Sequence, residues 1–455
     1  MARQRAIAIF DIGKTNKKLF VFNEQYRIVF EKTTLLEEST DEDGFPCENL
    51  DSLSAFVTGG LREVLHHNVE LMAVNFSAYG ASFVHVGDNG KPITPLYNYL
   101  KPYPEYLLRQ FYDAYGGEET FANETASPVL GSLNSGMQLY RIKYEQPQLF
   151  QKIRHAFHLP QYLSYLICGG KFSDLTSIGC HTNLWNFRNN NYHEWVTREG
   201  IVDKLLPIST SDTVIPSTVD ERRFTCGIGL HDSSAALIPY LSTFPEPFIL
   251  ISTGTWCITL NPFNNSPLTK HELKNDCLCY LQYDGKPVKA ARLFAGYMHD
   301  EQVNRIADFF HTDKSKYKNI SYDDELRPTL QKDDWPPALK NCAFENRELS
   351  LFSSDIQAYH QLIFDLVSQQ VYSTKLVLCD SDAKQIFVDG GFSKNEIYMN
   401  FLASAFPQMR VYATSMAQAT AIGAALVIHQ SWNGNSLPDD IVKLKEYTHR
   451  HRPVE

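Results

Sequence analysis

Three short turns rich in glycine and small hydroxyl residues follow apolar, strand-like segments of this chain. They are Asp11-Ile-Gly13-Lys14-Thr15-Asn16, Thr253-Gly254-Thr255 and Asp389-Gly390-Gly391. Glycine lets backbone N–H groups approach phosphate oxygens closely, so each turn is a candidate phosphate cradle. Taken singly, each turn is more typical of an ordinary hairpin or strand–helix connection. Three of them in one chain indicate a nucleotide site, although none has the spacing of the Walker loop or of the dinucleotide fingerprint.

Charged residues crowd the first of these turns. Asp11 ends a buried strand segment, a position from which a carboxylate commonly holds hydrated Mg²⁺. Lys14, Lys17 and Lys18 follow it, and they are either solvated hairpin charges or cations that face a phosphate. Three cations beside one carboxylate suit a phosphate site with a metal.

A second carboxylate stands in an unusual local setting. Gly227-Ile-Gly229-Leu-His231-Asp232-Ser-Ser-Ala places a His-Asp pair between glycines and a run of small residues. By local pattern, Asp232 is an N-cap of the helix that follows. The functional alternative is a carboxylate base at the bottom of a cleft, facing a hydroxyl nucleophile.

The elements that must position these residues alternate between strands and helices. The first two turns each join two apolar strand segments, 6–10 to 18–22 and 248–252 to 257–260, and this repetition divides the chain into halves of similar size. Hydrophobic spacing predicts further strands over 71–77, 82–86 and 385–389, and helices over 53–66, 135–145, 355–377 and 394–405. The alternation favours α/β lobes with mixed sheets, and the polar stretch 261–350 is expected to hold flexible insertions.

Composition excludes several classes of protein. The 455 residues include 42 Lys and Arg against 52 Asp and Glu, a net charge of −10, so no excess of cations is present to neutralise nucleic acid or a membrane surface. No apolar run approaches the roughly 18 residues that span a bilayer. The start of the chain lacks a signal-peptide pattern, and the nine cysteines show no disulfide framework. A cytoplasmic protein with reduced thiols is expected.

Five of these segments together resemble motifs of the FGGY carbohydrate kinases, which belong to the actin-like, Hsp70-like and hexokinase-like ATPase superfamily. Segment 11–18 resembles the first phosphate motif, with Lys18 at the place of the usual basic residue and Lys14 where threonine is commoner. Segment 252–256 resembles the second phosphate motif, 389–395 the adenosine motif and 419–425 the closing helix near the nucleotide. Segment 230–235 resembles the one that bears the catalytic base. The motifs follow the family's order from residue 6 to about residue 428.

The resemblance implies an α/β fold of two duplicated actin-like, ribonuclease-H-like lobes around a central cleft. Residues 1–245 would form the N-terminal lobe, with the sugar site, the first phosphate motif and the base, and 246–455 the C-terminal lobe, with the second phosphate motif and the adenosine site. It further implies ATP and Mg²⁺, with Asp232 accepting the hydroxyl proton and Asp11 holding the metal. The residues expected to contact ATP are Gly13, Lys14, Thr15, Asn16, Lys18, Thr253, Gly254, Thr255, Gly390, Gly391, Ser393 and Asn395.

The expected sugar-facing residues depart from the family pattern. Tyr79 replaces a usual histidine, and 97–101 replaces a Trp-Asn-Asp-x-Arg run. The substrate residues carried over are Tyr79, Gly80, Tyr97, Asn98, Lys101, His231 and Asp232. Because the His-Asp-Ser-Ser-Ala and Ser-Thr-Gly-Thr-Trp segments are closest to the L-rhamnulose and L-fuculose kinase branch, a ketose of that kind is expected.

Other readings of the sequence are a kinase of xylulose, another pentulose or a polyol, and a catalytically lapsed protein that only binds sugar and ATP, such as a sugar sensor. A chaperone or filament relative is disfavoured by the His231-Asp232 segment. The resemblance implies a small sugar as partner, no nucleic acid and no membrane, and is compatible with a homodimer.

Overall fold

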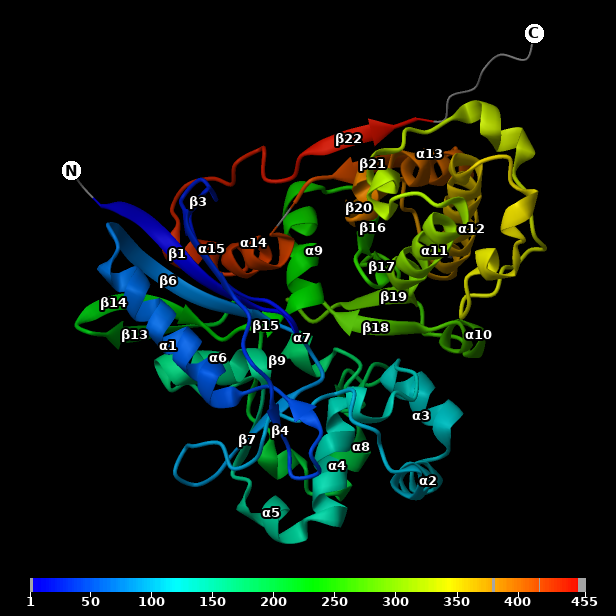
Figure 1. Ribbon diagram of the computed structural model, residues 1–455. Helices are drawn as coiled ribbons and strands as arrows, with labels where there is room; N and C mark the ends of the chain where they lie inside the picture. Colours follow the sequence, from blue (N-terminus) through cyan, green and yellow to red (C-terminus); the bar gives the residue numbers. More distant parts are fainter. Residues whose placement is uncertain (1–2, 379–380, 417, 449–455) are drawn as a thin grey trace. The chain divides into compact units, whose positions relative to one another are not determined.

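The computed structural model describes residues 3–378, 381–416 and 418–448, and these form two compact units (Figure 1). Unit 1 takes its described residues from 1–243, 279–287 and 418–441, and unit 2 takes its own from 244–278, 288–417 and 442–455. The predicted lobes 1–245 and 246–455 differ from these units in three segments: 279–287 and 418–441 are grouped with unit 1, and 244–245 with unit 2.

The sheet of unit 1 is built around two apolar strands that lie side by side and parallel. Its order is β13 (Val214–Val219), β14 (Arg222–Gly227), β6 (Val69–Ala78), β1 (Gln4–Ile12), β2 (Lys17–Asn23) and β3 (Ile28–Thr34), and β15 (Leu230–His231) also pairs with β6. Strands β1, β2 and β3 are antiparallel neighbours, whereas β6 is parallel to β1. The carboxyl ends of β1, β6 and β15 therefore come to the same edge of the sheet.

Helix α1 (Leu50–His66) covers one face of this sheet. Asn49 caps its first turn by accepting from Ser52 N, and its apolar positions recur at helical spacing. Leu53, Val57 and Leu61 are buried in one core cluster with Phe10 of β1. Helix α6 (Leu159–Cys168) packs into the same cluster through Leu159 and further apolar residues. Strand β8 (His155–His158) comes directly before α6 and pairs with β7 (Phe83–Val86).

The remaining elements of unit 1 are short helices and two-residue strands. Phe111 and Trp195 meet edge to face in a second, aromatic core. The helices are α2 (Glu105–Ala114), α3 (Glu118–Thr125), α4 (Ser135–Glu145), α5 (Pro147–Lys152), α7 (Leu175–Ile178), α8 (Glu194–Arg198), α9 (Asp232–Thr243), α14 (Ala419–Leu426) and α15 (His429–Trp432). The two-residue strand pairs are β4 (Ser39–Thr40) with β5 (Pro46–Cys47), β9 (Ser173–Asp174) with β12 (Ile208–Ser209), and β10 (Trp185–Asn186) with β11 (Asn191–Tyr192).

The sheet of unit 2 repeats the arrangement of three antiparallel strands followed by parallel ones. Its order is β18 (Cys277–Leu281), β19 (Pro287–Leu293), β17 (Cys257–Asn261), β16 (Phe248–Thr253), β20 (Gln385–Gly390), β21 (Arg410–Thr414) and β22 (Leu444–Tyr447). Residues 279–281 of β18 and residue 287 of β19 are grouped with unit 1. Strands β16 and β17 are antiparallel, and β20 and β21 continue in parallel from β16. The β19–β17–β16–β20–β21 order matches β3–β2–β1–β6–β14 of unit 1, so the predicted duplicated, actin-like and ribonuclease-H-like α/β lobes are confirmed.

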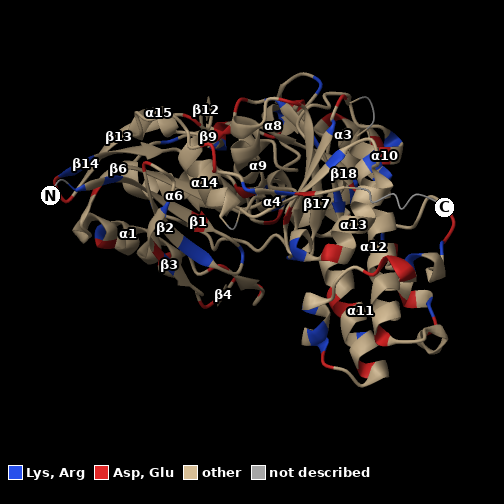
Figure 2. Cartoon of the chain, turned by 90° about the horizontal axis from the view of Figure 1, so that it is seen from above, with Lys and Arg blue, Asp and Glu red and all other residues tan. Residues whose placement is uncertain are grey.

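The prediction of flexible insertions over 261–350 is wrong. This stretch contains α10 (Lys270–Lys274), the strands β18 and β19, and α11 (Ala295–Phe310), followed by short 3₁₀ turns. Met298, Val303 and Ile306 of α11 are buried in the core of unit 2, beside α12 (Asp355–Leu378) and α13 (Glu396–Ala405). Acidic and basic residues are interspersed along α11 (Figure 2). Because they make the composition of the segment polar, its apolar stripe was not recognised and no helix was predicted there.

The other predicted elements are confirmed with small shifts in their bounds. The predicted helices are α1, α4, α12 and α13, and the apolar run 421–428 falls in α14 and the residues after it. Among the described residues, no helix is long and apolar enough to cross a bilayer.

Candidate active site

Asp11 is placed by the central strands of unit 1. It lies opposite Ser77 in the β1–β6 register, and Leu230 of β15 lies opposite the same serine on the other side of β6. This register brings Asp11 and the start of α9 to one edge of the sheet. The pKa of Asp11 is raised to about 6, mainly by burial and in smaller part by the charge of Asp232, whereas a hydrogen bond from Thr420 lowers it.

Asp232 begins α9 directly after β15. Its Oδ1 accepts the N–H of the next residue, Ser233, at 2.6 Å, and Asp232 is the first residue of the helix. The N-cap interpretation is therefore wrong, because a cap precedes the helix and accepts from an N–H two or three residues further on. The side chain remains 30% exposed, yet its surroundings are dry enough that burial raises the pKa of Asp232 to about 6. The contact with Ser233 leaves base chemistry open to this residue, because the carboxylate keeps an exposed face.

His231 supports Asp232 from the buried side. Its Nε2 lies 3.2 Å from Asp232 Oδ1, and its backbone N–H donates to Thr176 Oγ1 at 2.9 Å. Burial lowers the pKa of His231 to about 3, so the ring is neutral at physiological pH. A neutral imidazole orients the carboxylate without neutralising it.

Gly80 makes room for this histidine. A Cβ at Gly80 would lie 2.7 Å from Cys180 Sγ and 3.0 Å from Cδ2 of His231. Cys180 Sγ itself lies 3.0 Å from His231 Nε2. Of the sequence-predicted substrate residues, Gly80, His231 and Asp232 are thus brought together.

The lysines of the first turn have separate roles. Lys17 is almost fully buried, and its Nζ binds Glu48 Oε2 at 2.9 Å and the carbonyl oxygens of Gly13 and Lys14 at 3.1 and 2.9 Å. It therefore braces the turn from inside, which corrects the expectation of three cations facing one phosphate. Lys14 pairs with Glu38 at 3.1 Å, and the charge of Lys18 acts on Asp11.

The backbone of the same turn is accessible. Thr15 and Asn16 are exposed, and Gly13 N donates to Asn16 O at 3.0 Å to close the turn. The predicted ATP contacts of Gly13, Thr15 and Asn16 stay predictions that this exposure permits.

Helix α14 contributes a residue that sequence reasoning missed. Thr420 Oγ1 donates to Asp11 Oδ2 at 2.9 Å. Helix α14 reaches Asp11 because Gly423 packs against α9, where a Cβ at that glycine would lie 1.8 Å from Ala235 O. The sequence motif 419–425 had pointed to the helix, and the small residues in it were the signal for close packing.

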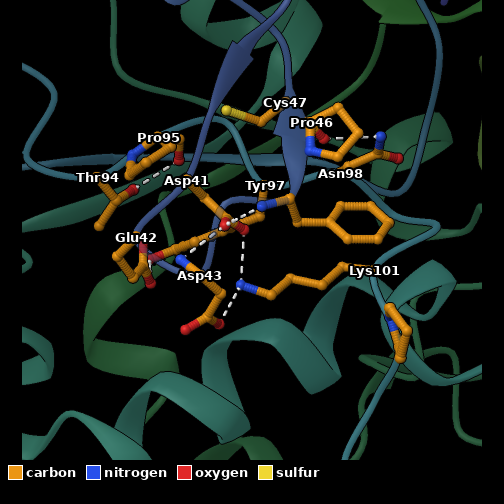
Figure 3. A network of polar contacts seen from close by, with 12 residues as sticks. Asp41, Glu42, Asp43, Pro46, Cys47, Thr94, Pro95, Tyr97, Asn98 and Lys101 are labelled. Carbon is orange, nitrogen blue, oxygen red and sulfur yellow. Dashed lines mark hydrogen bonds and ion pairs between the residues drawn. The ribbon is translucent and has the colours of Figure 1, made fainter.

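Three of the four remaining predicted sugar residues are engaged with the loop 41–46 (Figure 3). Tyr97 Oη donates to Glu42 Oε1 at 2.7 Å, Asn98 Nδ2 donates to Pro46 O at 3.0 Å, and Lys101 Nζ pairs with Asp41 and Asp43, each at 2.6 Å. These residues line a cavity of about 300 Å³ together with residues of α4. Their polar groups are occupied within the protein.

The fourth, Tyr79, is also held internally. Its hydroxyl donates to Glu48 Oε2 at 3.2 Å, the carboxylate that Lys17 binds. Its ring meets that of Tyr99 at 6.0 Å. The structure therefore ties Tyr79 to the first phosphate turn, and its contact with sugar stays a prediction.

Tyr99 is a second residue that sequence reasoning missed. Burial raises its pKa, and the charge of Asp232 adds to the rise, which places its hydroxyl within the field of the candidate base. The available signal was its position, since it stands where the family motif has an aspartate.

The glycine turns of unit 2 meet each other. Gly391 N donates to Thr253 O at 2.9 Å, and Phe392 N donates to Thr253 Oγ1 at 3.0 Å. Gly390 has φ +88°, and a Cβ there would lie 1.9 Å from Thr253 O, so only glycine fits. The predicted residues Thr253, Gly254, Thr255, Gly390 and Gly391 thus form one surface, of which all but Thr253 are exposed.

Gly296 at the start of α11 completes this surface and was not predicted. A Cβ there would lie 1.9 Å from Gly254 O, and Tyr297 N donates to Thr255 O at 3.2 Å. The other two predicted contacts point inward: Ser393 Oγ donates to Gly390 O at 2.8 Å, and Asn395 caps α13 and donates to Tyr359 Oη. Ser393 and Asn395 therefore shape the turn, and direct contact with a ligand stays a prediction.

No cluster of three or more His, Cys, Asp or Glu side chains arranged to hold a metal ion occurs in the part of the chain that is described. A divalent ion at Asp11 would therefore take most of its ligands from water and from a bound phosphate, which is the usual habit of Mg²⁺.

Comparison with known proteins gives consistent results. Residues 6–237 match the N-terminal domain of the FGGY family of carbohydrate kinases, and residues 245–436 match the C-terminal domain of carbohydrate kinase FGGY. A rhamnulokinase of Oceanobacillus iheyensis is 21% identical over 424 residues, which cover 85% of this chain and 84% of the relative.

Two solved structures share the fold. A carbohydrate kinase from Novosphingobium aromaticivorans has a TM-score of 0.77 at 19% identity, over 98% of this chain and 95% of the other. A xylulose kinase from Rhodospirillum rubrum has a TM-score of 0.79 at 15% identity, over 98% and 94%.

Proposed function

The chain belongs to the FGGY family of carbohydrate kinases, and from that membership we propose that it transfers the γ-phosphoryl group of ATP to a hydroxyl of a small ketose. The enzyme class, a phosphotransferase with an alcohol acceptor, follows from the family. The ketose we propose is L-rhamnulose or L-fuculose. The observation that carries the proposal is the pair of carboxylates, Asp11 and Asp232, at one edge of the unit 1 sheet.

Asp232 is proposed as the acceptor of the hydroxyl proton. A pKa of about 6 keeps it deprotonated at neutral pH and still basic enough to take a proton as the hydroxyl attacks. His231 holds the carboxylate from the buried side at 3.2 Å and stays neutral, so the negative charge remains available to the substrate.

Asp11 fits the magnesium ion that accompanies ATP. Its pKa is raised to about 6 by burial, and no described Lys or Arg side chain forms an ion pair with it, so a cation would stabilise the carboxylate. Bound through water, Mg²⁺ supplies charge stabilisation to the phosphates. Thr420 orients Asp11 by its hydrogen bond, and the turn formed by the half-buried Gly13 and the exposed Thr15 and Asn16 would bind phosphate oxygens. Lys14 and Lys18 add positive charge there.

The glycine surface of unit 2 is proposed to bind the nucleotide. Gly254, Thr255, Gly390 and Gly391 present backbone without side-chain obstruction, and a Cβ added at Gly391 would approach nothing closer than Thr253 O at 4.0 Å. The open space beside Gly391 would allow the nucleotide to lie directly against the backbone. We further propose a cytoplasmic location, and the oligomeric state stays a prediction.

The choice of ketose rests on the relatives and on the local sequence. The rhamnulokinase of Oceanobacillus iheyensis aligns over most of the chain. The alternatives are xylulose, another pentulose or a polyol as substrate, or a protein that binds sugar and ATP without transfer.

A screen of ATP consumption tests the proposal. The purified chain is incubated with ATP·Mg²⁺ and L-rhamnulose, L-fuculose, D-xylulose, glycerol or an aldose, and ADP and sugar phosphate are both measured. Stoichiometric ADP and sugar phosphate with one of the two deoxyketoses supports it. Binding of ATP and sugar without any sugar phosphate would instead identify the lapsed binding protein.

A further inference from the structure

Two cysteines of unit 1 meet at the end of α6. Cys168 is the last residue of this helix, and Cys226 lies on β14. Ser164, one helical turn before Cys168, has its Oγ 3.5 Å from Cys168 Sγ and 3.7 Å from Cys226 Sγ. Both thiols are free in this structure. Both sulfurs therefore contact the same hydroxyl, at the point where the end of α6 meets β14.

The two thiols have opposite environments. The hydrogen bond from Cys226 lowers the pKa of Cys168 to about 6 against the effect of burial, and Gly170 N, which donates to Cys168 Sγ at 3.3 Å, lowers it as well. Cys226 is fully buried, and burial raises its pKa well above the ordinary value. At neutral pH, Cys168 is therefore the thiolate and partly exposed, whereas Cys226 is a protonated thiol behind it. This division matches that of an attacking cysteine and a resolving one.

We propose that Cys168 and Cys226 form a thiol oxidation site that hydroperoxides convert to a disulfide. The Cys168 thiolate attacks the peroxide oxygen, the O–O bond breaks, and a sulfenic acid and hydroxide form. The Cys226 sulfur then attacks the Cys168 sulfur, the S–O bond breaks, and water leaves with the thiol proton. In sum, two thiols are oxidised to one disulfide and one hydrogen peroxide is reduced to two waters.

This site adjoins the segment that leads to Asp232. Ser164 Oγ donates to Gly227 O at 2.8 Å, and Gln161 Nε2 donates to Gly229 O at 2.8 Å. Helix α6 thus holds the backbone just before β15 and the candidate base. A disulfide draws Cys168 and Cys226 to a bond of about 2.05 Å, so it must shift the end of α6 against β14. Because α6 holds the segment before Asp232, we expect the disulfide to change kcat. That expectation rests on the proposed function, whereas the oxidation chemistry does not.

The first experiment measures thiol reactivity on the full chain. Limiting iodoacetamide at pH 7 is expected to alkylate Cys168 at least about 10-fold faster than Cys342, and the rate of Cys168 should rise with pH around 6. Cys342 is the matched internal control, because it is buried and burial raises its pKa to about 12. Equal rates for the two cysteines would overturn the assignment of a thiolate at Cys168.

The second experiment follows oxidation. Stoichiometric hydrogen peroxide should remove two thiols per chain, yield a Cys168–Cys226 linked peptide on mass spectrometry, and be reversed by dithiothreitol. Cys168→Ser should abolish the linkage, Cys226→Ala should halt at a dimedone-reactive Cys168, and Cys342→Ala should behave as the native chain. If Cys226→Ala does not fold, the presence or absence of the Cys168–Cys226 linked peptide in the oxidised native chain still tests whether the disulfide forms.

Oxidation of other cysteines while Cys168 and Cys226 stay reduced would overturn the proposal. An oxidised chain with the linked peptide and unchanged kcat would leave the thiol site standing but refute its effect on Asp232. A chain that never phosphorylates any sugar yet forms the linked peptide would refute only the proposed function.

Discussion

Asp232 combines a helix start with an open carboxylate face, and an amide can separate the two. Asparagine still accepts the Ser233 N–H, so Asp232→Asn should retain the fold and ATP binding. It cannot take up a proton, and kcat with the best sugar should fall by ~10²–10⁴-fold, the usual contribution of a positioned base. Steady-state kinetics beside ATP titration calorimetry measure both effects.

Asp113→Asn is the matched control for this substitution. Asp113 is an exposed carboxylate on α2 of the same unit, and its replacement should leave kcat within error of the native value. A near-native kcat for Asp232→Asn would show that Asp232 only begins α9 and that another group accepts the proton.

The same carboxylate predicts a pH profile. Burial raises its pKa from 3.8 to about 6, and neither His231, whose pKa is about 3, nor Tyr99, whose pKa is raised, changes charge near that pH. Asp11, also near 6, titrates with it, so the two act as a coupled pair. We expect kcat/KM to rise with pH through about 6 and then to level off.

Stability should move in the opposite direction. A folded-state pKa above the unfolded value favours the folded state at low pH, and this advantage is lost as pH rises through about 6. Asparagine does not titrate, so Asp232→Asn lacks this loss of stability with rising pH. The melting temperature of the variant relative to that of the native chain should therefore increase between about pH 4 and pH 7. A difference in melting temperature that is independent of pH would contradict the raised pKa.

Gly391 and Gly390 offer a pair of substitutions that separate binding from folding. Gly391 has φ −62° and open space around it, so valine should be tolerated by the protein while it crowds a nucleotide. Gly391→Val should raise the KM for ATP by about 10-fold or more with little change in the KM for sugar. That figure corresponds to at least about 1.4 kcal/mol of lost binding.

Gly390→Val is the contrasting variant. Its φ of +88° and the approach of Thr253 O predict a loss of melting temperature rather than a selective effect on ATP. Equal weakening of both substrates by Gly391→Val, at an unchanged melting temperature, would argue against the nucleotide assignment.

At the scale of elements, the contact between α9 and α14 positions both candidate carboxylates. Asp232 begins α9, Thr420 of α14 holds Asp11, and Gly423 allows the two helices to approach. Gly423→Ala places a methyl group where Ala235 O now lies, and overpacking of this kind costs about 1–3 kcal/mol. We expect a lower melting temperature and also a lower kcat, because both carboxylates shift.

Gly59→Ala controls for the change of glycine to alanine in a helix. Gly59 is exposed in α1 with no atom within 4 Å of an added Cβ, so this variant should gain about 0.5–1 kcal/mol and keep its activity. Gly423→Ala with native kcat would show that the contact stabilises the fold without positioning the site.

Some elements could be predicted from the sequence because burial on both faces leaves a continuous apolar run, as in 6–10 and 248–252. Helix α11 could not, since its buried residues, among them Met298, Val303 and Ile306, alternate with charged and other polar residues on the exposed face. The same limit applies to side chains. Lys17 was grouped with the other lysines of the turn because the sequence gives no sign of its partner Glu48, 31 residues away.

At the scale of the whole molecule, the chain leaves unit 1 after residue 243 and returns to it at 279–287 and 418–441. A single division between residues 245 and 246 cannot include these returns. The duplicated hairpins mark the start of each sheet, but nothing in a local pattern shows that α14 folds against α9. The hydrogen bond between Thr420 and Asp11, 409 residues apart, could only come from the structure.

The substrate preference is a property of the whole enzyme, and it depends on the prediction that Tyr79, Tyr97 and Lys101 line the sugar site. Tyr79, Tyr97 and Lys101 use their hydroxyls and ammonium group within the protein, on Glu48, Glu42 and Asp41. Side chains already bound in this way contribute walls rather than new hydrogen bonds to a sugar. Walls of this kind accept a methyl group at little cost, as a 6-deoxyketose requires.

We therefore expect kcat/KM to be higher for L-rhamnulose or L-fuculose than for D-xylulose and glycerol, with a difference of ~10–200-fold. That range is typical of apolar discrimination, whereas a site that hydrogen-bonds one defining hydroxyl rejects analogues without it by ~10⁴-fold or more. Kinetics with the four substrates at saturating ATP measure the ratios. A higher kcat/KM for D-xylulose or glycerol than for either deoxyketose would refute the preference. A ratio near 10⁴ between the two deoxyketoses would show that a polar group, for which Tyr99 near Asp232 is the first candidate, reads a single hydroxyl.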